Sequence, residues 1–283
     1  MESEIKNHYN SDHLTQNIKA ALIKAGKDLS NLELKDLSPI DQIHTGGARS
    51  SIELFKKLNI SSDALVPDTL FLDAGCGIGG STRLLARQFK CRVIGVDLAD
   101  KFIEAATFLT QCTHLETLAS FQQGSILELP FENNTFDAVL CQHILMNIED
   151  KAAAAKEFFR VLKPGGKVLL HEIAKGENDP LLLPVPWADK SSISFLESWD
   201  IMSHIFKEHG FGIESFSDQT SGAIAGWEKF NALSKKGPPR PNALGLGIIF
   251  GSDAELFGKN MYANFKNNVI CVVEAVLKKS YNK

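Results

Sequence analysis

Glycines and acidic residues between Leu72 and Gly80 form a pattern that could hold a nucleotide-like cofactor. The segment TLFLDAGCGIGGSTRLLARQF reads as an apolar strand, a glycine-rich turn and the start of a helix. Glycines permit positive φ angles and let a ligand approach the backbone, and a helix N-terminus offers unpaired N–H groups. Asp97 ends the next apolar run, 24 residues after Asp73. A carboxylate at that place can accept hydrogen bonds from both ribose hydroxyls of an adenosine.

The glycine spacing alone leaves two cofactor classes open, because Gly75, Gly77 and Gly80 also fit the dinucleotide pattern G-x-G-x-x-G. Asp73 separates the two classes. A carboxylate against the turn repels a diphosphate but suits the α-ammonium side of S-adenosylmethionine. Charge therefore predicts S-adenosylmethionine, with S-adenosylhomocysteine as product, over a nicotinamide dinucleotide. For the loop the alternative is a plain tight turn, and for Asp97 it is a helix N-cap.

Side chains that could act on a second substrate follow the predicted strand FDAVLCQ. His143 comes directly after this strand, where open parallel sheets have their ligand crevice, and imidazole can take a proton near neutral pH. We therefore predict His143 as the catalytic residue; the alternative is a histidine satisfied by a loop carbonyl. His171, His204 and His209 lack this context and are expected to be structural. Residues predicted to contact the acceptor are His44, Met146, Asn147 and Trp187, although His44 could be merely exposed and Trp187 a hydrophobic plug.

Alternating strand and helix patterns from Thr69 onward predict an α/β fold with a mostly parallel sheet covered on both faces. Expected strands span 69–74, 91–98, 119–123, 136–142, 167–174, 211–218 and 268–277. Expected helices span 12–26, 48–58, 79–89, 100–112, 151–162, 198–209 and 223–235.

Three regions follow from these patterns: an N-terminal helical extension (1–60), a cofactor-binding core (61–175), and the rest of the sheet with cap insertions (176–283). The insertions are expected at 176–196 and 222–267. The second contains the breaker run GPPRPN and the glycine-rich patch GLGIIFG.

Composition limits the partners. The 283 residues are 44% hydrophobic and 23% charged, as in ordinary globular proteins. The net charge of −4, without a dense Lys/Arg run, argues against nucleic acid, and no apolar run reaches 18 residues. Five dispersed cysteines argue against disulfides and a metal site. We expect a cytoplasmic protein without a stable membrane anchor, a monomer or homodimer, that acts on a small molecule.

Four ordered motifs over roughly residues 70–172 resemble the class I S-adenosylmethionine-dependent methyltransferases. They are LDAGCGIGG, GVDLA, GSILELPFENNTFD and VLKPGGKV. The resemblance implies a Rossmann-like, seven-stranded sheet of order 3-2-1-4-5-7-6 with the last strand antiparallel. It also implies that Asp97 binds the ribose and Leu98 packs on the adenine. Further cofactor contacts implied by the family are Asp73, Gly75, Cys76, Gly77, Gly124, Ser125, Ile126 and Gln142.

Three other segments resemble a bacterial branch related to sarcosine/dimethylglycine and phosphoethanolamine N-methyltransferases: DQIHTGG (41–47), CQHILMNI (141–148) and PVPWADKSSISFL (184–196). This resemblance implies methyl transfer to a small molecule, with an amine nitrogen favoured. An O- or C-methyltransferase acting on a phenol, quinone or lipid is the alternative. Because the family often has Asp where this chain has Ser125, a non-catalytic module that binds S-adenosylmethionine also stays open.

Overall fold

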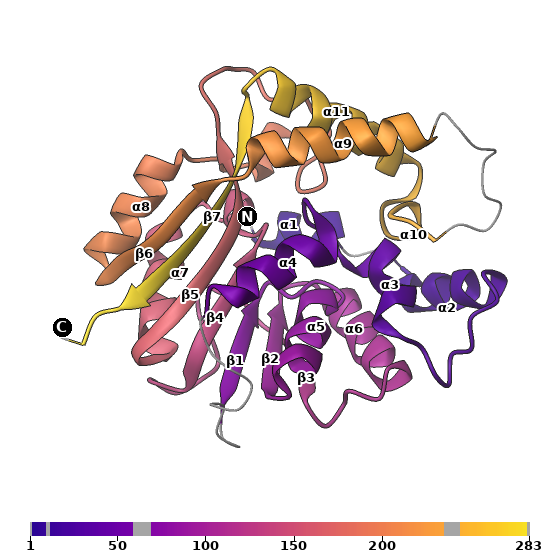
Figure 1. The fold of residues 1–283 in the computed structure, drawn as a ribbon, viewed down its shortest axis with the longest axis horizontal. Helices are drawn as coiled ribbons and strands as arrows, with labels where there is room; N and C mark the ends of the chain where they lie inside the picture. Colours follow the sequence, from indigo (N-terminus) through magenta and orange to yellow (C-terminus); the bar gives the residue numbers. More distant parts are fainter. Residues whose placement is uncertain (1, 10–11, 59–68, 235–243, 282–283) are drawn as a thin grey trace.

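A single seven-stranded sheet forms the centre of the computed structural model, which describes residues 2–9, 12–58, 69–234 and 244–281 (Figure 1). The order β3-β2-β1-β4-β5-β7-β6 confirms the predicted order. β7 runs antiparallel to both of its neighbours, as predicted, and the other pairs are parallel. The strands are β1 (Leu70–Ala74), β2 (Arg92–Asp97), β3 (Ala119–Gln123), β4 (Phe136–Gln142), β5 (Leu162–Lys175), β6 (Phe211–Asp218) and β7 (Ile270–Lys279).

β5 begins five residues before its predicted start at Lys167, a difference that the pairing with β4 explains. Leu162 is already in register with Phe136, and the register then shifts before Ala138 pairs with Lys167. The extra residues of the LKPGG turn are absorbed by this irregularity, so the turn belongs to the strand.

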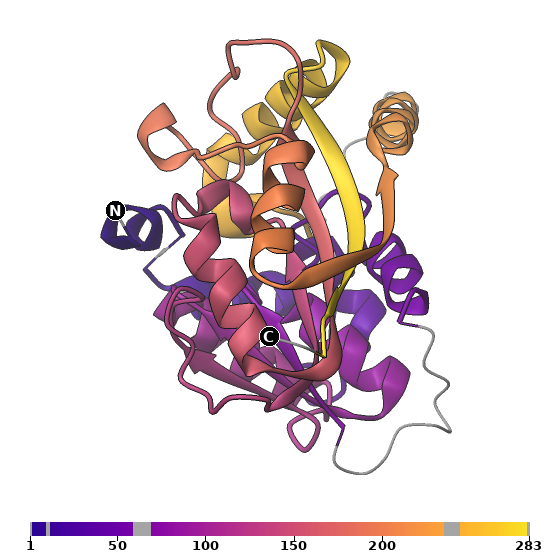
Figure 2. The ribbon, with the colours of Figure 1, turned by 90° about the vertical axis from the view of Figure 1, so that its left-hand side faces the viewer.

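Helices cover both faces of the sheet (Figure 2). α4 (Gly47–Lys56) and α5 (Gly80–Phe89) pack on one face through Leu54, Phe55 and Leu85. α7 (Lys151–Val161) and α8 (Trp199–Glu208) pack on the other through Phe158 and Phe206. α6 (Asp100–Cys112) follows β2 and packs against β3 and α2 (Leu14–Lys24). The predicted two-faced arrangement is confirmed.

Helices outside the sheet layers cover the carboxyl ends of the central strands. They are α1 (Glu2–Tyr9), α3 (Leu34–Asp41), α9 (Thr220–Ser234), α10 (Gly247–Phe250) and α11 (Ala254–Lys266). α9 was predicted three residues later, and α1, α3, α10 and α11 were not predicted. The whole run GPPRPN (237–242) lies outside the described residues, and so does the proposed region boundary between residues 60 and 61.

The missed helix α11 had a readable signal. Phe257, Met261 and Phe265 recur every four residues, which is a helical stripe, and all three are buried. α1 has only Ile5 and Tyr9 at that spacing, too few to predict a helix, and its position depends on contacts with distant parts of the chain.

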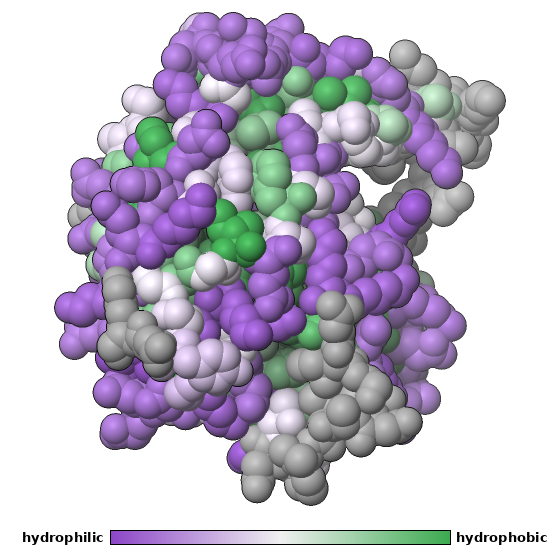
Figure 3. Space-filling model, turned by 60° about the vertical axis from the view of Figure 1, so that its left-hand side comes forward, coloured by the Kyte–Doolittle hydropathy of each residue, from purple (hydrophilic) through white to green (hydrophobic). Residues whose placement is uncertain are grey.

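Hydrophilic side chains dominate the face shown in Figure 3, where hydrophobic ones occur in small groups. Among the described residues, no helix combines the length and apolar character needed to cross a membrane.

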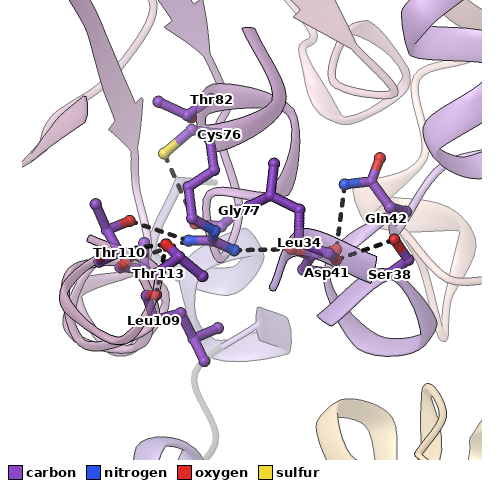
Figure 4. Close-up of polar contacts among 12 residues, drawn as sticks. Leu34, Ser38, Asp41, Gln42, Cys76, Gly77, Thr82, Leu109, Thr110 and Thr113 are labelled. Carbon is purple, nitrogen blue, oxygen red and sulfur yellow. Dashed lines mark hydrogen bonds and ion pairs between the residues drawn. The ribbon is translucent and has the colours of Figure 1, made fainter. Parts of the chain in front are cut away.

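A buried ion pair joins the end of α3 to α5. Arg83 Nη2 lies 2.9 Å from Asp41 Oδ2, and both side chains are almost fully buried. Arg83 Nη1 also donates to Thr110 Oγ1 on α6, at 3.1 Å. Figure 4 shows Asp41 and Gln42 on one side of this cluster and Thr110 on the other. A Cβ atom on Gly80 would lie 2.0 Å from Asp41 O, so the two helices approach closely. The pair therefore fixes the segment after α3 beside the glycine loop.

Replacing Asp41 by Ala should lower the free energy of unfolding by about 3–5 kcal/mol, because Arg83 would keep a buried, unpaired charge. The control is Glu104→Ala, which removes the exposed partner of Lys101 and should cost about 1 kcal/mol or less. Urea unfolding measures both. A loss below 1 kcal/mol for Asp41→Ala would contradict this role.

Candidate functional site

One cavity of about 380 Å³ lies at the carboxyl ends of β1, β2 and β4. It is closed by α1, by the loop after α3 and by two further segments, one around Trp187 and one from Leu246 to Met261, which together are called the cap. The structure brings together on its wall every residue that the sequence singled out for the site: His44, Asp73, Gly75, Cys76, Gly77, Asp97, Leu98, Gly124, Ser125, Ile126, Gln142, His143, Met146, Asn147 and Trp187.

The glycine loop leaves bare backbone on the cavity wall. Gly75 has φ +79°, and a Cβ atom there would lie 2.2 Å from Ile144 Cδ1. Gly77 has φ +54°, yet the nearest atom to a Cβ there would be Phe102 Cδ2, at 4.0 Å. Gly75 is therefore required by conformation and by packing. At Gly77 the backbone has space in front of it for a ligand.

Asp73 at the end of β1 is a buried carboxyl group. It accepts a hydrogen bond from Thr82 Oγ1 at 2.6 Å. Burial raises its pKa to about 7; the Thr82 hydrogen bond opposes this shift, and the nearby Asp97 charge adds to it. A cation in the cavity would stabilise the ionised form of Asp73.

Asp97 at the end of β2 lies beside the same loop. Its Oδ2 accepts from Gly77 N at 2.8 Å, and its Oδ1 accepts from Ala99 N at 2.9 Å. Burial raises the pKa of Asp97, and these backbone hydrogen bonds oppose the shift. The N-cap residue of α6 is Ala99, so the alternative assignment of Asp97 as the helix N-cap is wrong.

Gln142 is held between α4 and α5 at the end of β4. Its Oε1 accepts from Ser81 Oγ at 2.7 Å and from Ser51 Oγ at 3.3 Å. Its Nε2 lies 3.4 Å from His171 Nδ1. These contacts fix the amide orientation at the junction between the glycine loop and the acceptor side.

Three histidine side chains, those of His44, His143 and His171, lie close to one another near Gln142. The ring centroid of His143 lies 5.0 Å from that of His171 and 6.1 Å from that of His44. Burial lowers the pKa of His44 to about 4 and that of His171 to about 3. Burial and the two neighbouring imidazoles hold the pKa of His143 far below its usual value. All three rings are therefore neutral at neutral pH.

His143 differs from its neighbours in its hydrogen bonding. His44 Nε2 lies 2.8 Å from Ser51 Oγ and 3.1 Å from Gly47 O, so His44 is tied to α4 rather than free in a polar loop. Among the described residues, His143 Nε2 is buried without a hydrogen-bond partner, which disfavours the alternative of a histidine satisfied by a loop carbonyl at this atom. The expectation that His171 lacks a site context needs correction, because pairing of β4 with β5 sets it beside Gln142.

Glu172 holds the loop that carries His143. Its carboxyl group is buried and accepts from Ile144 N at 3.0 Å and from Leu145 N at 3.1 Å. Cys141 Sγ donates to it at 3.2 Å. Burial raises its pKa to about 8, against these hydrogen bonds. No sequence pattern indicated this role, because the contact joins β5 to the turn after β4.

α1 closes the cavity from the outside. Tyr9 Oη donates to Asn147 Oδ1 at 2.8 Å, and Asn147 Nδ2 donates to the carbonyls of Trp187 and Ile193. At its other end, Glu2 accepts from Ser125 Oγ. Helix α1 therefore bridges the loop after β3 and the cap segment. Cavity residues that the sequence reading missed include Glu2, Ile5, Lys6, Tyr9, Phe102, Phe250, Phe257 and Met261.

Comparison with known proteins assigns the family. Residues 72–170 match the family model described as "Methyltransferase domain". The chain is 32% identical over 138 residues to phosphoethanolamine N-methyltransferase 1 of Arabidopsis thaliana, which is 49% of this chain and 27% of that protein. It is 34% identical over 132 residues to glycine/sarcosine/dimethylglycine N-methyltransferase of Actinopolyspora halophila, 47% of this chain and 22% of that one.

The name of a third relative indicates a different kind of acceptor molecule. The 2-methyl-6-phytyl-1,4-hydroquinone methyltransferase of Synechocystis sp. is 33% identical over 138 residues, 48% of this chain and 42% of that protein. The chain thus aligns with less than half the length of each of these three relatives.

Solved structures share the fold. Phosphoethanolamine N-methyltransferase 2 of Haemonchus contortus superposes with a TM-score of 0.68 at 19% identity, covering 98% of this chain and 60% of that one. Geranyl diphosphate C-methyltransferase of Streptomyces coelicolor gives 0.65 at 17% identity, covering 96% and 99%. The chain belongs to the class I S-adenosylmethionine-dependent methyltransferases, related to the phosphoethanolamine and glycine/sarcosine/dimethylglycine enzymes. This confirms the resemblance read from the motifs and removes the nicotinamide alternative.

The raised pKa of Glu172 predicts a pH-dependent stability difference. The folded state binds this proton more tightly than the unfolded state, so the contribution is fully present below about pH 4.5 and is lost as pH rises through about 8. In Glu172→Gln this loss disappears. Relative to the wild type, the stability of the variant should therefore rise between pH 5 and pH 8.5.

Urea unfolding at several pH values measures this difference, and Glu177→Gln, an exposed position, controls for the substitution itself. A difference that stays constant over this range, or falls, would contradict the assignment.

Proposed function

We propose that the protein transfers a methyl group from S-adenosylmethionine to a small-molecule acceptor, most favourably to an amine nitrogen. The observation that carries the cofactor assignment is the pair of carboxyl groups, Asp73 buried and Asp97 partly buried, beside the open backbone of Gly77. A cationic cofactor stabilises the ionised forms of both groups, whereas a diphosphate would destabilise them.

The residues present fit this cofactor. Asp73 and the loop Gly75–Gly77 would hold the amino-acid end, and Asp97 the ribose. Leu98 and the backbone at Gly124–Ile126 would hold the adenine, with Gln142 near the sulfur. The sulfonium supplies a methyl group that is already activated. The protein therefore has to align the acceptor, exclude water and accommodate a proton, and alignment can contribute on the order of 7–11 kcal/mol.

The nitrogen assignment is supported by the names of the relatives. Two of them are N-methyltransferases, and the Haemonchus contortus enzyme shares the fold. The hydroquinone methyltransferase and the C-methyltransferase support oxygen or carbon as the second candidate. A neutral His143 on the cavity wall is compatible with each, since its imidazole can hydrogen-bond an acceptor group.

Two measurements test the proposal. Calorimetric titration should show binding of S-adenosylmethionine and S-adenosylhomocysteine, and no binding of nicotinamide dinucleotides. Incubation with methyl-labelled S-adenosylmethionine and a panel of amines, phenols and lipids should give labelled products detected by mass spectrometry. Tight cofactor binding without any labelled product would favour a non-catalytic module, and products only from phenols or lipids would overturn the nitrogen assignment.

Cofactor affinity should increase with pH between about 6 and 8, because the cation binds best when Asp73 is ionised and the pKa of Asp73 is about 7 in the free protein. Binding at pH 7 should release a proton, detectable by calorimetry in buffers of different ionisation enthalpy. In Asp73→Asn the affinity should be weaker and this proton release should be absent. The same proton release in the variant would assign it to another group.

Replacing His143 should lower turnover while leaving the affinity for S-adenosylmethionine within about twofold. His143→Asn is the suitable variant, because His143 has φ +54° and Asn tolerates that backbone conformation. A group that hydrogen-bonds or deprotonates the acceptor contributes about 10²–10⁴-fold to the rate. His204→Ala, on the exposed side of α8, is the control. Unchanged turnover in His143→Asn would make His143 a structural residue.

A further inference from the structure

The end of the cavity away from the glycine loop is lined by apolar side chains from four separate segments. They come from α1, from the turn after β4, from the segment around Trp187, and from α10 and α11. Helix α11 contributes two of them, one turn apart. The main ones are Ile5, Met146, Trp187, Phe250, Phe257 and Met261.

Three polar side chains at this end already join the surrounding segments to one another. Asn147 donates to the carbonyls of Trp187 and Ile193 and accepts from Tyr9. Trp187 Nε1 donates to Ser194 Oγ at 2.9 Å. These groups cannot bind a ligand without losing an existing hydrogen bond. By contrast, His143 Nε2 has no hydrogen-bond partner in the described part of the chain.

Charge on the cavity wall is predominantly negative. Carboxyl groups on the wall include Asp73 and Asp97 beside the glycine loop and Glu149 and Asp150 after β4. Among the described residues that line the cavity, the one Lys or Arg is Lys6, and its Nζ lies 2.8 Å from Asp100 Oδ1.

Among the described residues, no other side chain on the cavity wall supplies a fixed positive charge that would offset an added negative one. Within the described ranges, no group of three His, Cys, Asp or Glu side chains is arranged to hold a metal ion. A phosphate or carboxylate on the acceptor would therefore lie near the wall carboxyl groups without a cationic side chain to pair with, which is unfavourable in a partly desolvated site.

We propose that the acceptor has an extended apolar body and no anionic group, and that it binds as a neutral molecule or a cationic amine between α1, Trp187 and α11. This inference rests on the proposed methyl transfer, which makes the cap end of the cavity the acceptor side. It separates this chain from enzymes whose acceptor carries a phosphate or carboxylate, since such an acceptor needs a cationic partner. Phe257 and Met261 on α11 then contribute to acceptor specificity.

Three probes that share an octyl chain and differ in their head group test whether the site disfavours an anionic acceptor. Octan-1-ol, octylamine and octyl phosphate are titrated into the protein saturated with S-adenosylhomocysteine, and tryptophan fluorescence follows binding, since Trp187 and Trp227 line the cavity. The alcohol and the amine should bind saturably, with the phosphate at least tenfold weaker. Sarcosine and phosphoethanolamine should give no saturable signal. Equal or tighter binding of octyl phosphate, sarcosine or phosphoethanolamine would overturn the inference, as would no binding of the alcohol and the amine.

A matched pair of variants on α11 tests the location. Phe257 is 6% exposed and faces the cavity, whereas its neighbour Leu256 is 44% exposed. Phe257→Ala should weaken octan-1-ol binding at least fivefold and leave S-adenosylhomocysteine affinity within twofold. Leu256→Ala should change neither affinity. Equal octan-1-ol affinities for the two variants would overturn the assignment of this cavity end.

The cofactor measurement keeps the two proposals separable. If S-adenosylhomocysteine fails to bind the wild-type protein, the proposed function fails and the inference about the acceptor fails with it. If it binds while the anionic probes bind best, only the inference about the acceptor is overturned.

Discussion

Two carboxyl groups at the ends of neighbouring parallel strands, one buried and one partly buried, are the constraint on which the site depends. Asp73 and Asp97 each accept hydrogen bonds, yet burial still raises the pKa of both. A bound cation would stabilise the ionised forms of both groups. The open backbone at Gly77 sets the position where that cation can approach. Family membership and the chemistry of the loop therefore point to the same class of cofactor.

Other buried ionisable groups position the segments around this pair. Asp41 and Arg83 link the loop carrying His44 to α5, and Glu172 gathers the backbone amides of the turn that carries His143. Each group costs desolvation energy when buried, and each is compensated by polar partners from a different element. Both faces of the site are thus defined by contacts between segments far apart in the chain.

The acceptor side of the cavity differs from the cofactor side, because it is lined mainly by apolar side chains. Asn147, Tyr9 and Trp187 use their polar atoms to join α1, the turn after β4 and the cap. Apolar side chains from α1, the segment around Trp187 and α11 therefore form much of the surface left for a ligand. This division explains how one cavity can combine a cationic cofactor with an acceptor recognised mainly by shape and apolar contact. It also narrows the range of acceptors suggested by relatives that match only part of the chain.

The sequence by itself determined the strands of the sheet, and the family resemblance implied their order; the sequence also singled out the residues of the glycine loop and Asp97 that line the cavity. Strand and helix periodicities are local, and the motif from Leu72 to Gly80 places its chemistry within a few residues. Only the tertiary structure decided that His171 lies beside His143, that Glu172 holds the turn after β4, and that α1 and α11 close the cavity. These features depend on strand register and on contacts across more than a hundred residues, such as that of Tyr9 with Asn147. Local spacing carries no information about such contacts, because they form only when the sheet and the cap pack together.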